Sequence, residues 1–357
     1  MKHLFLFLAI TLATFHVKAQ YPAVTIPGSE VRTITSKIVV GQEYQLHILL
    51  PGGYKKTNKK YPVVYLMDSQ WDFPLVKSIY GQQYFDGFIP EVIIVGVTWG
   101  GNNPNPDSLR ARDYTPTNES RQPQSCGADN FLSFIKNELF PFMETNYTTD
   151  VNNRTLMGCS LGGLFTMYTL FTHPEMFTGY AAASPAIGWD KEVLYQYEKK
   201  YVENKSNPPA KLYITIGDVE RNVPNFEKMV SHLQSRKYTS LQITSKVLEN
   251  TGHSGTKSET YTRGLQYIFK KPDVKVDEVI LSKYAGTYQT VAGNNIELRV
   301  ENYQLVLYLN AANRYVLKAS SDKTFYSTAE ILNIVMNANG NGFQLNRYGD
   351  SQSATKK

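Results

Sequence analysis

A serine between glycines lies near the middle of the sequence, in the segment Gly158-Cys159-Ser160-Leu161-Gly162. The apolar residues before it are typical of a strand, and the residues after it are typical of a helix that ends before a proline. Small neighbours allow such a serine to occupy a sharp strand-to-helix turn, where its hydroxyl is exposed and the next backbone N–H can face an oxyanion. The spacing therefore predicts Ser160 as a nucleophile and the Leu161 N–H as an oxyanion donor.

A serine nucleophile needs a base, and an imidazole is the usual one. His253 lies in the segment TGHSG, which we expect to be a loop between the last strand and the closing helix of the first domain. The other histidines beyond the N-terminal segment fall within predicted strands or helices, or at a helix end: His47, His232 and His173. His253 is therefore the predicted general base.

The third member of such a site is a carboxylate that orients the imidazole. The predicted strand 211–217 ends in Gly217-Asp218-Val219-Glu220, so two candidate acids leave the same turn, and Asp190 is a more remote third. The chain order serine, acid, histidine is that of α/β-hydrolases and differs from the orders of other serine hydrolases. The acid of many α/β-hydrolases lies three residues past such a glycine, which favours Glu220 and leaves Asp218 as the alternative.

The elements that must position these residues alternate along the chain. Residues 30–50 predict two antiparallel strands joined by a turn, and apolar runs of strand length recur at 61–68, 92–99, 153–160, 177–186, 211–217 and 241–249. Helical patterns lie between and after the runs at 61–68 and 92–99, and they include residues 130–147, 161–174, 226–237 and 259–271. Strands that alternate with helices predict an α/β fold with a mainly parallel sheet, whose ligand site lies at the carboxyl ends of the strands.

The pattern changes after Lys271. Residues 272–279 are polar and predict a linker, and short alternating runs separated by Asn, Gly, Ser and Asp turns follow them. We therefore expect an α/β-hydrolase domain at residues 20–271 and a small all-β domain at residues 272–357. The last segment, SQSATKK, is predicted to be frayed.

The first nineteen residues have the pattern of a signal peptide. Lys2 and His3 precede an apolar run at residues 4–15, and the small residues Val17 and Ala19 suit the positions −3 and −1 of a signal-peptidase site. The run is too short to span a bilayer, and no later window has 18 continuous apolar residues. We expect a signal peptide at residues 1–19, a periplasmic or secreted mature chain, and no membrane span.

The composition excludes several classes of protein. The chain has 357 residues, 42% hydrophobic and 19% charged, with a formal net charge of +6, which excludes a wholly disordered chain, a collagen and a coiled coil. No basic helix or repeated aromatic platform favours nucleic-acid binding. No H-E-x-x-H, paired C-x-x-C or Walker glycine loop favours a metal or a nucleotide, so no metal and no cofactor are expected. Whether Cys126 and Cys159 form a disulfide stays open.

Residues from about 30 to 270 resemble the esterase family of the α/β-hydrolase superfamily, which includes enterochelin esterases, S-formylglutathione hydrolases, feruloyl esterases and acetyl xylan esterases. The motifs that carry the resemblance are YQLHILLPGGY, YPVVYLMD, RARDYTPT, GADNFLSFIKNELFPFMETNY, MGCSLGGLFTMY, HPEMFTGYAAASPAIGWD and TGHSG. The YAGTYQ segment resembles the start of a small β-domain that is appended to some serine hydrolases. The resemblance implies a serine carboxylic ester hydrolase that works through an acyl-enzyme.

The resemblance also implies that the loop Asp68-Ser69-Gln70 supplies a second oxyanion N–H, from Ser69 or Gln70. Side chains in loops at the catalytic end of the sheet are the candidate substrate contacts, with loop packing as the alternative: Trp71, Trp99, Arg112, Tyr114 and Trp189. Export favours a small-molecule or glycan ester outside the cytoplasm, such as an acylated glycan or a siderophore lactone. An acyltransferase with the same three residues and a non-catalytic glycan-binding protein are the alternatives, and the oligomeric state is not predicted.

Overall fold

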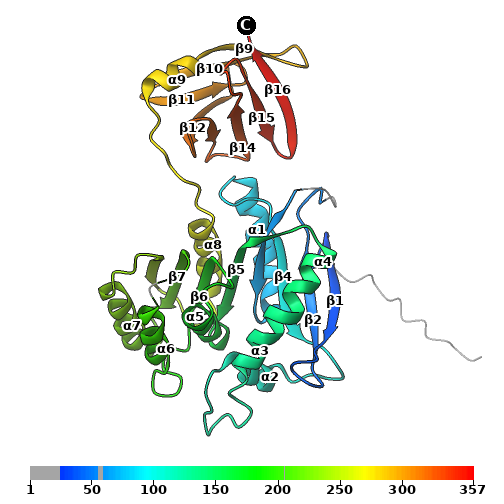
Figure 1. Cartoon of the computed structure of the whole chain (residues 1–357), viewed down its shortest axis with the longest axis vertical. Coiled ribbons are helices and arrows are strands. Elements are labelled where there is room, and N and C mark those ends of the chain that lie inside the picture. The colour runs from blue at the N-terminus through cyan, green and yellow to red at the C-terminus, as the bar shows by residue number, and fades with distance from the viewer. Residues whose placement is uncertain (1–24, 55–58, 205) are drawn as a thin grey trace, which may run out of the picture.

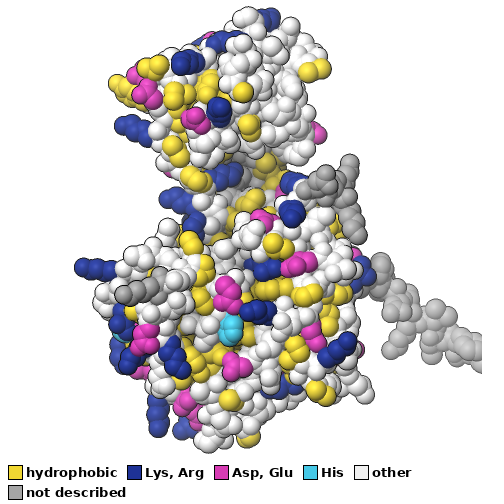
Figure 2. Space-filling view, viewed as in Figure 1, with side chains coloured by type: hydrophobic (Ala, Val, Ile, Leu, Met, Phe, Trp, Pro, Cys, Tyr) yellow, Lys and Arg dark blue, Asp and Glu magenta, His cyan; other side chains and the backbone are white. Residues whose placement is uncertain are grey.

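The computed structural model describes residues 25–54, 59–204 and 206–357. The predicted signal peptide at residues 1–19 lies outside them. The described chain forms a sheet covered by helices and, after it, a closed β-barrel (Figure 1), and the surface narrows between these two parts (Figure 2). Among the helices that the structure describes, none is both long and apolar enough to cross a bilayer.

The sheet has eight strands in the order β1-β2-β4-β3-β5-β6-β7-β8. Strands β1 and β2 pair antiparallel, as do β2 and β4, and the pairs from β4 to β8 are parallel. The predicted α/β fold with a mainly parallel sheet is therefore confirmed. The strands are β1 (Ser29–Thr35), β2 (Glu43–Leu49), β3 (Tyr61–Leu66), β4 (Ile93–Trp99), β5 (Thr149–Cys159), β6 (Gly179–Ala183), β7 (Ala210–Gly217) and β8 (Leu241–Leu248).

Helices cover both faces of this sheet (Figure 1). They are α1 (Ser69–Phe85), α2 (Pro106–Tyr114), α3 (Ala128–Phe134), α4 (Phe140–Asn146), α5 (Leu161–Thr172), α6 (Leu194–Glu203), α7 (Val223–Ser235) and α8 (Thr256–Ile268), with a π-helical turn, Ile135–Leu139, between α3 and α4.

Two apolar cores lie on the two faces of the sheet. Helices α1 and α8 pack over a core that contains Val64 and Met157, and the helices from α3 to α7 pack over a core that contains Val63 and Leu164. Val63 and Val64 are neighbours on β3, so each face of that strand is buried. Burial on both faces explains why the central strands are continuous apolar runs in the sequence.

The C-terminal part is an eight-stranded antiparallel barrel, closed by pairing of β16 with both β15 and β9. The predicted fraying of the last segment is wrong, because it forms β16, in which Ala354 faces the core between exposed polar neighbours. The elements are α9 (Glu278–Tyr284), β9 (Gly286–Thr290), β10 (Asn295–Glu301), β11 (Gln304–Tyr308), β12 (Arg314–Ala319), β13 (Thr324–Tyr326), β14 (Leu332–Met336), β15 (Gly342–Arg347) and β16 (Asp350–Lys356).

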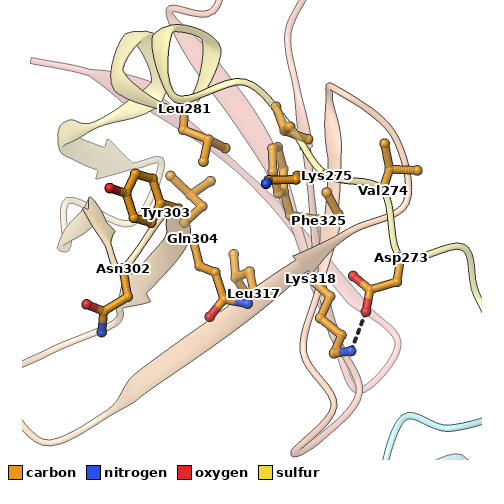
Figure 3. A pocket seen from close by; sticks show the side chains of 13 residues that line it. Asp273, Val274, Lys275, Leu281, Asn302, Tyr303, Gln304, Leu317, Lys318 and Phe325 are labelled. Atoms are coloured by element: carbon orange, nitrogen blue, oxygen red, sulfur yellow. Dashed lines mark hydrogen bonds and ion pairs between the residues drawn. The ribbon is translucent and has the colours of Figure 1, made fainter.

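Side chains fill the inside of the barrel. Tyr288, Leu307, Ile334 and Phe343 belong to its single apolar core and are almost fully buried. A cavity of about 330 Å³ lies beside this core, between the linker residues 273–276, the β10–β11 turn and β12 (Figure 3). The barrel is therefore a packed domain with a small surface cavity, not an open channel.

The barrel contacts the esterase-like part at one end of α1. Phe85, the last residue of α1, stacks on Tyr348 of the barrel with 5.4 Å between ring centroids. A Cβ on Gly87 would lie 2.6 Å from the Glu330 carbonyl oxygen, so the two backbones approach closely here. Helix α1 begins after the carboxyl end of β3 and has 17 residues, which corresponds to about 25 Å. The barrel therefore lies far from the carboxyl ends of the strands (Figure 1).

Candidate active site

The predicted nucleophile lies in a strained turn between β5 and α5. Ser160 has φ 60° and ψ −115°, a conformation that is costly for a residue with a side chain. A Cβ on Gly158 would lie 2.5 Å from the Gly162 carbonyl carbon, so the turn requires glycine there. The Ser160 N–H donates to the Ala183 carbonyl (3.0 Å), and the Ala186 N–H donates to the Ser160 carbonyl (3.1 Å). Hydrogen bonds to the segment after β6 thus hold the strained turn.

The structure brings Glu220, among the candidate acids, to the predicted base. Glu220 Oε2 lies 2.6 Å from His253 Nδ1. Burial acts to raise the pKa of Glu220, but hydrogen bonds from Ser184, from the Gly217 N–H and from His253 outweigh it and lower that pKa. The carboxylate is therefore ionised at neutral pH, and we assign the Nδ1 proton to the bond with it. Nε2 is then free to accept a proton, as a general base must.

Ser160 Oγ and the His253 ring are not hydrogen-bonded to each other in the described part of the chain. Catalytic hydrogen bonds are often long in ligand-free structures and tighten when the substrate binds. Ser160 follows the carboxyl end of β5 and His253 follows that of β8, at the same edge of the parallel part of the sheet. A rotation about the Ser160 side chain changes their separation without a change of fold.

The alternative acid, Asp218, has a different place. Its carboxylate accepts the backbone N–H groups of Asn250 (3.0 Å) and Thr251 (3.1 Å), and these bonds lower its pKa. Asp218 therefore tethers the loop that carries His253.

The loop after β3 begins with Asp68 in the left-handed region, with φ 56° and ψ 39°. The Ser69 side chain is fully buried, and its Oγ lies 2.8 Å from Nδ1 of His47, whose pKa is lowered by burial. A Cβ on Gly96 would overlap Ser69 Oγ, so only glycine fits opposite it. Because its side chain is buried, Ser69 could bind an oxyanion only through its backbone N–H.

Two other predicted oxyanion donors are Leu161 and Gln70. Leu161 is the first residue of α5, so its N–H has no partner within the helix. The side-chain amide of Gln70 is buried, and neither its oxygen nor its nitrogen has a hydrogen-bond partner among the residues that the structure describes. Buried polar atoms without partners are rare in native structures and are frequent at functional sites.

Arg110 is a site residue that the sequence pattern did not reveal. Its guanidinium donates twice to Asp68, at 3.0 and 2.8 Å, and once to the Cys159 carbonyl, at 3.3 Å. It also lies over the Trp71 ring, 5.7 Å from the centroid. Arg110 thus ties the predicted oxyanion loop to the strand that carries the nucleophile.

Arg112, which the sequence favoured, lies two residues further along α2. Residues two apart on a helix do not share a face, so only one of these arginines can reach the site. Arg112 donates to Asp113 (2.7 Å) and to Gln42 (2.9 Å). Had the helix in the motif RARDY been recognised, its spacing would have shown that the two arginines lie on different faces, but not which of them faces the site.

The predicted aromatic contacts separate into exposed and packed residues. Trp71 is 49% exposed, whereas Trp99 is 4% exposed and its Nε1 donates to Asp113 (2.7 Å). Tyr114 is fully buried, and its hydroxyl accepts the Asp68 N–H. Trp189 is half-buried, and its Nε1 donates to Thr117 Oγ1 (3.1 Å). Among these residues, Trp71 offers the broadest surface to a ligand.

Both cysteines are free, so the structure holds no bond between Cys126 and Cys159. Cys126 is exposed and Cys159 is buried. Burial raises the pKa of the Cys159 thiol to about 12. The thiol beside Ser160 is therefore protonated at neutral pH and does not compete with it as a nucleophile.

A buried ion pair joins the helices that follow the predicted oxyanion loop and the base loop. Lys257 Nζ donates to Asp72 Oδ1 (2.6 Å), and the Tyr261 hydroxyl donates to Asp72 Oδ2 (2.8 Å). Asp72 belongs to the first turn of α1, and Lys257 to the first turn of α8, four residues after His253. This pair therefore fixes the base loop relative to the oxyanion loop.

Comparison with known proteins agrees with this geometry. Residues 36–262 match the model of the family named Esterase, whose description is "Putative esterase". The chain belongs to this esterase family. The matched residues of the esterase begin directly after β1, end within α8 and do not include the barrel.

The esterase is 32% identical over 215 residues to the ferri-bacillibactin esterase BesA of Bacillus subtilis (strain 168), a match that covers 56% of this chain and 73% of that protein. It is 26% identical over 213 residues to the siderophore triacetylfusarinine C esterase of Aspergillus fumigatus, a match that covers 57% of this chain and 73% of that protein. The structure of an IroE-like serine hydrolase from Shewanella oneidensis matches with a TM-score of 0.60 at 25% identity, over 68% of this chain and 80% of that one. The chain is accordingly a serine esterase with the α/β-hydrolase fold.

Proposed function

We propose that this esterase hydrolyses siderophore esters outside the cytoplasm, with Ser160 as nucleophile, His253 as base and Glu220 as acid. The observation that carries the proposal is the 2.6 Å bond between Glu220 and His253 at the same end of the sheet as the strained Ser160 turn. Export by the signal peptide at residues 1–19 is part of the proposal, as are an esterase domain at residues 20–271 and an accessory domain at residues 272–357.

The reaction takes two steps. His253 Nε2 removes the Ser160 hydroxyl proton while Oγ bonds to the ester carbonyl carbon, and His253 then returns that proton to the leaving alcohol as the carbon–oxygen bond breaks. Water repeats the sequence on the acyl-enzyme and releases the acid. The oxyanion is stabilised by the Leu161 N–H and by an N–H of Ser69 or Gln70. One such donor contributes on the order of 3 kcal/mol to transition-state stabilisation.

Two features support a siderophore ester rather than an acylated glycan. Relatives that match most of their own length are esterases of ferri-bacillibactin and of triacetylfusarinine C. At the site, the exposed Trp71 ring lies under the Arg110 guanidinium, a pairing that suits an aromatic group with negative charge, such as a catecholate. Trp71 is the substrate contact that we propose, together with the edge of Trp189. Arg110, which Asp68 already binds, places positive charge beside the Trp71 ring. Trp99 and Arg112 are left out because Asp113 already binds both.

The test uses the purified mature chain beside Ser160→Ala and His253→Ala. We expect a fluorophosphonate probe to label the wild type at Ser160 and neither variant, and we expect hydrolysis of a catecholate trilactone siderophore at a higher kcat/KM than that of acetylated xylan. A wild type that labels but prefers the xylan would overturn the substrate class alone. A wild type that does not label would overturn the assigned nucleophile. An ester product formed with an added alcohol would instead indicate acyl transfer.

A further inference from the structure

Ser184, the residue directly after β6, has an unusual backbone and a buried side chain. It is 3% exposed and has φ 39°, in the left-handed region that favours glycine. Its N–H donates to the Thr215 carbonyl of the neighbouring strand (2.8 Å), which holds the backbone in place. A serine that is kept at a strained, buried position by its surroundings points to a role for its side chain.

The Ser184 hydroxyl lies between the acid and the base loop. Its Oγ is 2.6 Å from Glu220 Oε1 and 3.0 Å from Thr256 Oγ1. Thr256 in turn donates its hydroxyl hydrogen to the His253 carbonyl (2.7 Å). A hydroxyl has one hydrogen, and a carboxylate is the stronger acceptor, so we assign the Ser184 hydrogen to Glu220.

The residues around Ser184 also hold the nucleophile. Ala183 accepts the Ser160 N–H through its carbonyl, and the Ala186 N–H donates to the Ser160 carbonyl. The segment 183–186 therefore makes two kinds of contact. Its backbone binds the turn that carries Ser160, and its Ser184 side chain binds the acid.

We propose that Ser184 is a positioning residue, which orients the Glu220 carboxylate so that Oε2 meets His253 Nδ1. This inference rests on the proposed triad. The Gly217 N–H also donates to Oε1 (2.9 Å), so the carboxylate keeps one buried donor when Ser184 is replaced. The Ser184 hydroxyl is a second donor to Oε1. Two donors together restrict rotation of the carboxylate, and this rotation decides whether Oε2 faces His253 Nδ1. Its removal should therefore affect turnover more than folding.

The first variant is Ser184→Ala, which removes the hydroxyl and keeps the backbone strain. We expect kcat to fall about tenfold to a hundredfold, the range for a lost hydrogen bond to a charged group, with KM within about threefold of the wild type. Ser184→Gly removes the same hydroxyl but relieves the strain, because glycine tolerates a positive φ. Both variants should lose the same activity, although their unfolding temperatures should differ.

Ser36→Ala is the matched control. Ser36 is 4% exposed, and its Oγ also donates to a carboxylate, Glu138 Oε2, at 2.7 Å, away from the site. We expect kcat of Ser36→Ala to equal that of the wild type.

A double-mutant cycle with Glu220→Gln separates a positioning role from a structural one. If Ser184 acts through Glu220, adding Ser184→Ala to Glu220→Gln should change kcat by less than about twofold. The inference would be overturned if Ser184→Ala lowered kcat equally in the wild type and in Glu220→Gln. It would also be overturned if Ser184→Ala and Ser184→Gly both kept the wild-type kcat. In either case, a loss of kcat in Glu220→Gln would leave the proposed triad standing. Full activity in Glu220→Gln would instead contradict the triad itself.

Discussion

The ion pairs beside the candidate site are buried more deeply than the ion pairs of the barrel. In the esterase domain, ion pairs beside the site are buried: Arg110 and Asp68 are 16% and 2% exposed, and Lys257 and Asp72 are 20% and 3% exposed. In the barrel, the pair Arg299–Glu297 is 52% and 39% exposed. Burial of a charge pair is costly in free energy and is often no better for stability than an apolar pair. The buried pairs are therefore best explained by the positions that they impose on the site loops.

Backbone strain shows the same contrast. Asp68, Ser160 and Ser184 have positive φ at the ends of neighbouring strands, where the esterase chemistry is proposed. In the barrel, Asn302 and Tyr303 have φ 48° and 61°, and they form the two-residue turn between β10 and β11. A hairpin turn of this kind requires positive φ at both residues, because its twist matches that of the strands. A positive φ therefore accompanies the candidate site at these three residues and hairpin geometry at Asn302 and Tyr303.

The largest expected effect concerns the acid. Glu220→Gln should lower kcat by about 10⁴-fold, as loss of the acid does in comparable triads, because the amide cannot hold the imidazole in the required tautomer. Steady-state hydrolysis of an activated ester measures this change. An equal fall caused by Asp218→Asn would mean that the loop tether, rather than the contact of Glu220 with His253, carries the effect.

Replacement of Arg110 tests the buried charge directly. Arg110→Met leaves the Asp68 carboxylate buried without its partner, so we expect a loss of about 3–5 kcal/mol in the free energy of unfolding. We also expect kcat to fall, because the loop 68–70 loses its connection to Cys159. Denaturant unfolding measures the first change and ester hydrolysis the second. Normal stability and normal turnover together would show that the pair positions nothing.

A substitution in the barrel core should change the stability of the barrel and leave ester hydrolysis unchanged. Leu307 is fully buried in the barrel core, and Leu307→Ala should destabilise the barrel by about 2–5 kcal/mol, through lost burial and the cavity left behind. The kcat for ester hydrolysis should stay unchanged under native conditions, because the barrel contacts the far end of α1. A tenfold fall in kcat would show that the two parts are coupled after all.

The Glu220 carboxylate should also make stability depend on pH. Its pKa is lowered in the folded chain, so it binds a proton less readily there than in the unfolded chain. The carboxylate therefore contributes fully to the unfolding free energy above its unfolded pKa of about 4.3. This contribution is lost as the pH falls through the lower pKa of the folded chain. The difference in unfolding free energy between the wild type and Glu220→Gln should shrink in acid. A difference that is constant from pH 7 to pH 3 would contradict this.

The sequence predicted the parts of the fold that depend on local pattern. The central strands were predicted because burial on both faces makes them continuous apolar runs. The sharp turn at Ser160 was predicted because such a turn needs the glycines beside it. A helical pattern was expected between the strands at 61–68 and 92–99, but the bounds of α1 were not predicted, since Pro74 and Gly81 interrupt its apolar pattern. Strand β16 was missed because its residues are polar, and its pairing with β9 joins segments far apart in the chain.

The candidate site could be predicted where residue type and loop position together indicate the chemistry, as for His253. The choice between Arg110 and Arg112 depends on which face of α2 packs against the site, and no local pattern reports this. Trp99 was expected as a substrate contact, but it is the last residue of β4 and its indole is buried against Asp113. The contacts of Ser184 join three strand ends, so only the folded chain reveals them.

The smallest expected effect belongs to the surface charges of the barrel. Arg299→Met makes the same replacement as Arg110→Met, but both partners of Arg299–Glu297 stay in water. Exposed pairs contribute little, because solvent screens them and ordering two long side chains is costly. We therefore expect a change in unfolding free energy that lies within the experimental limit of denaturant unfolding. Measurements at low and high salt should agree within the same limit. If Arg299→Met destabilised its domain as much as Arg110→Met does, burial would not distinguish the two pairs, and the buried pairs beside the site would need another explanation.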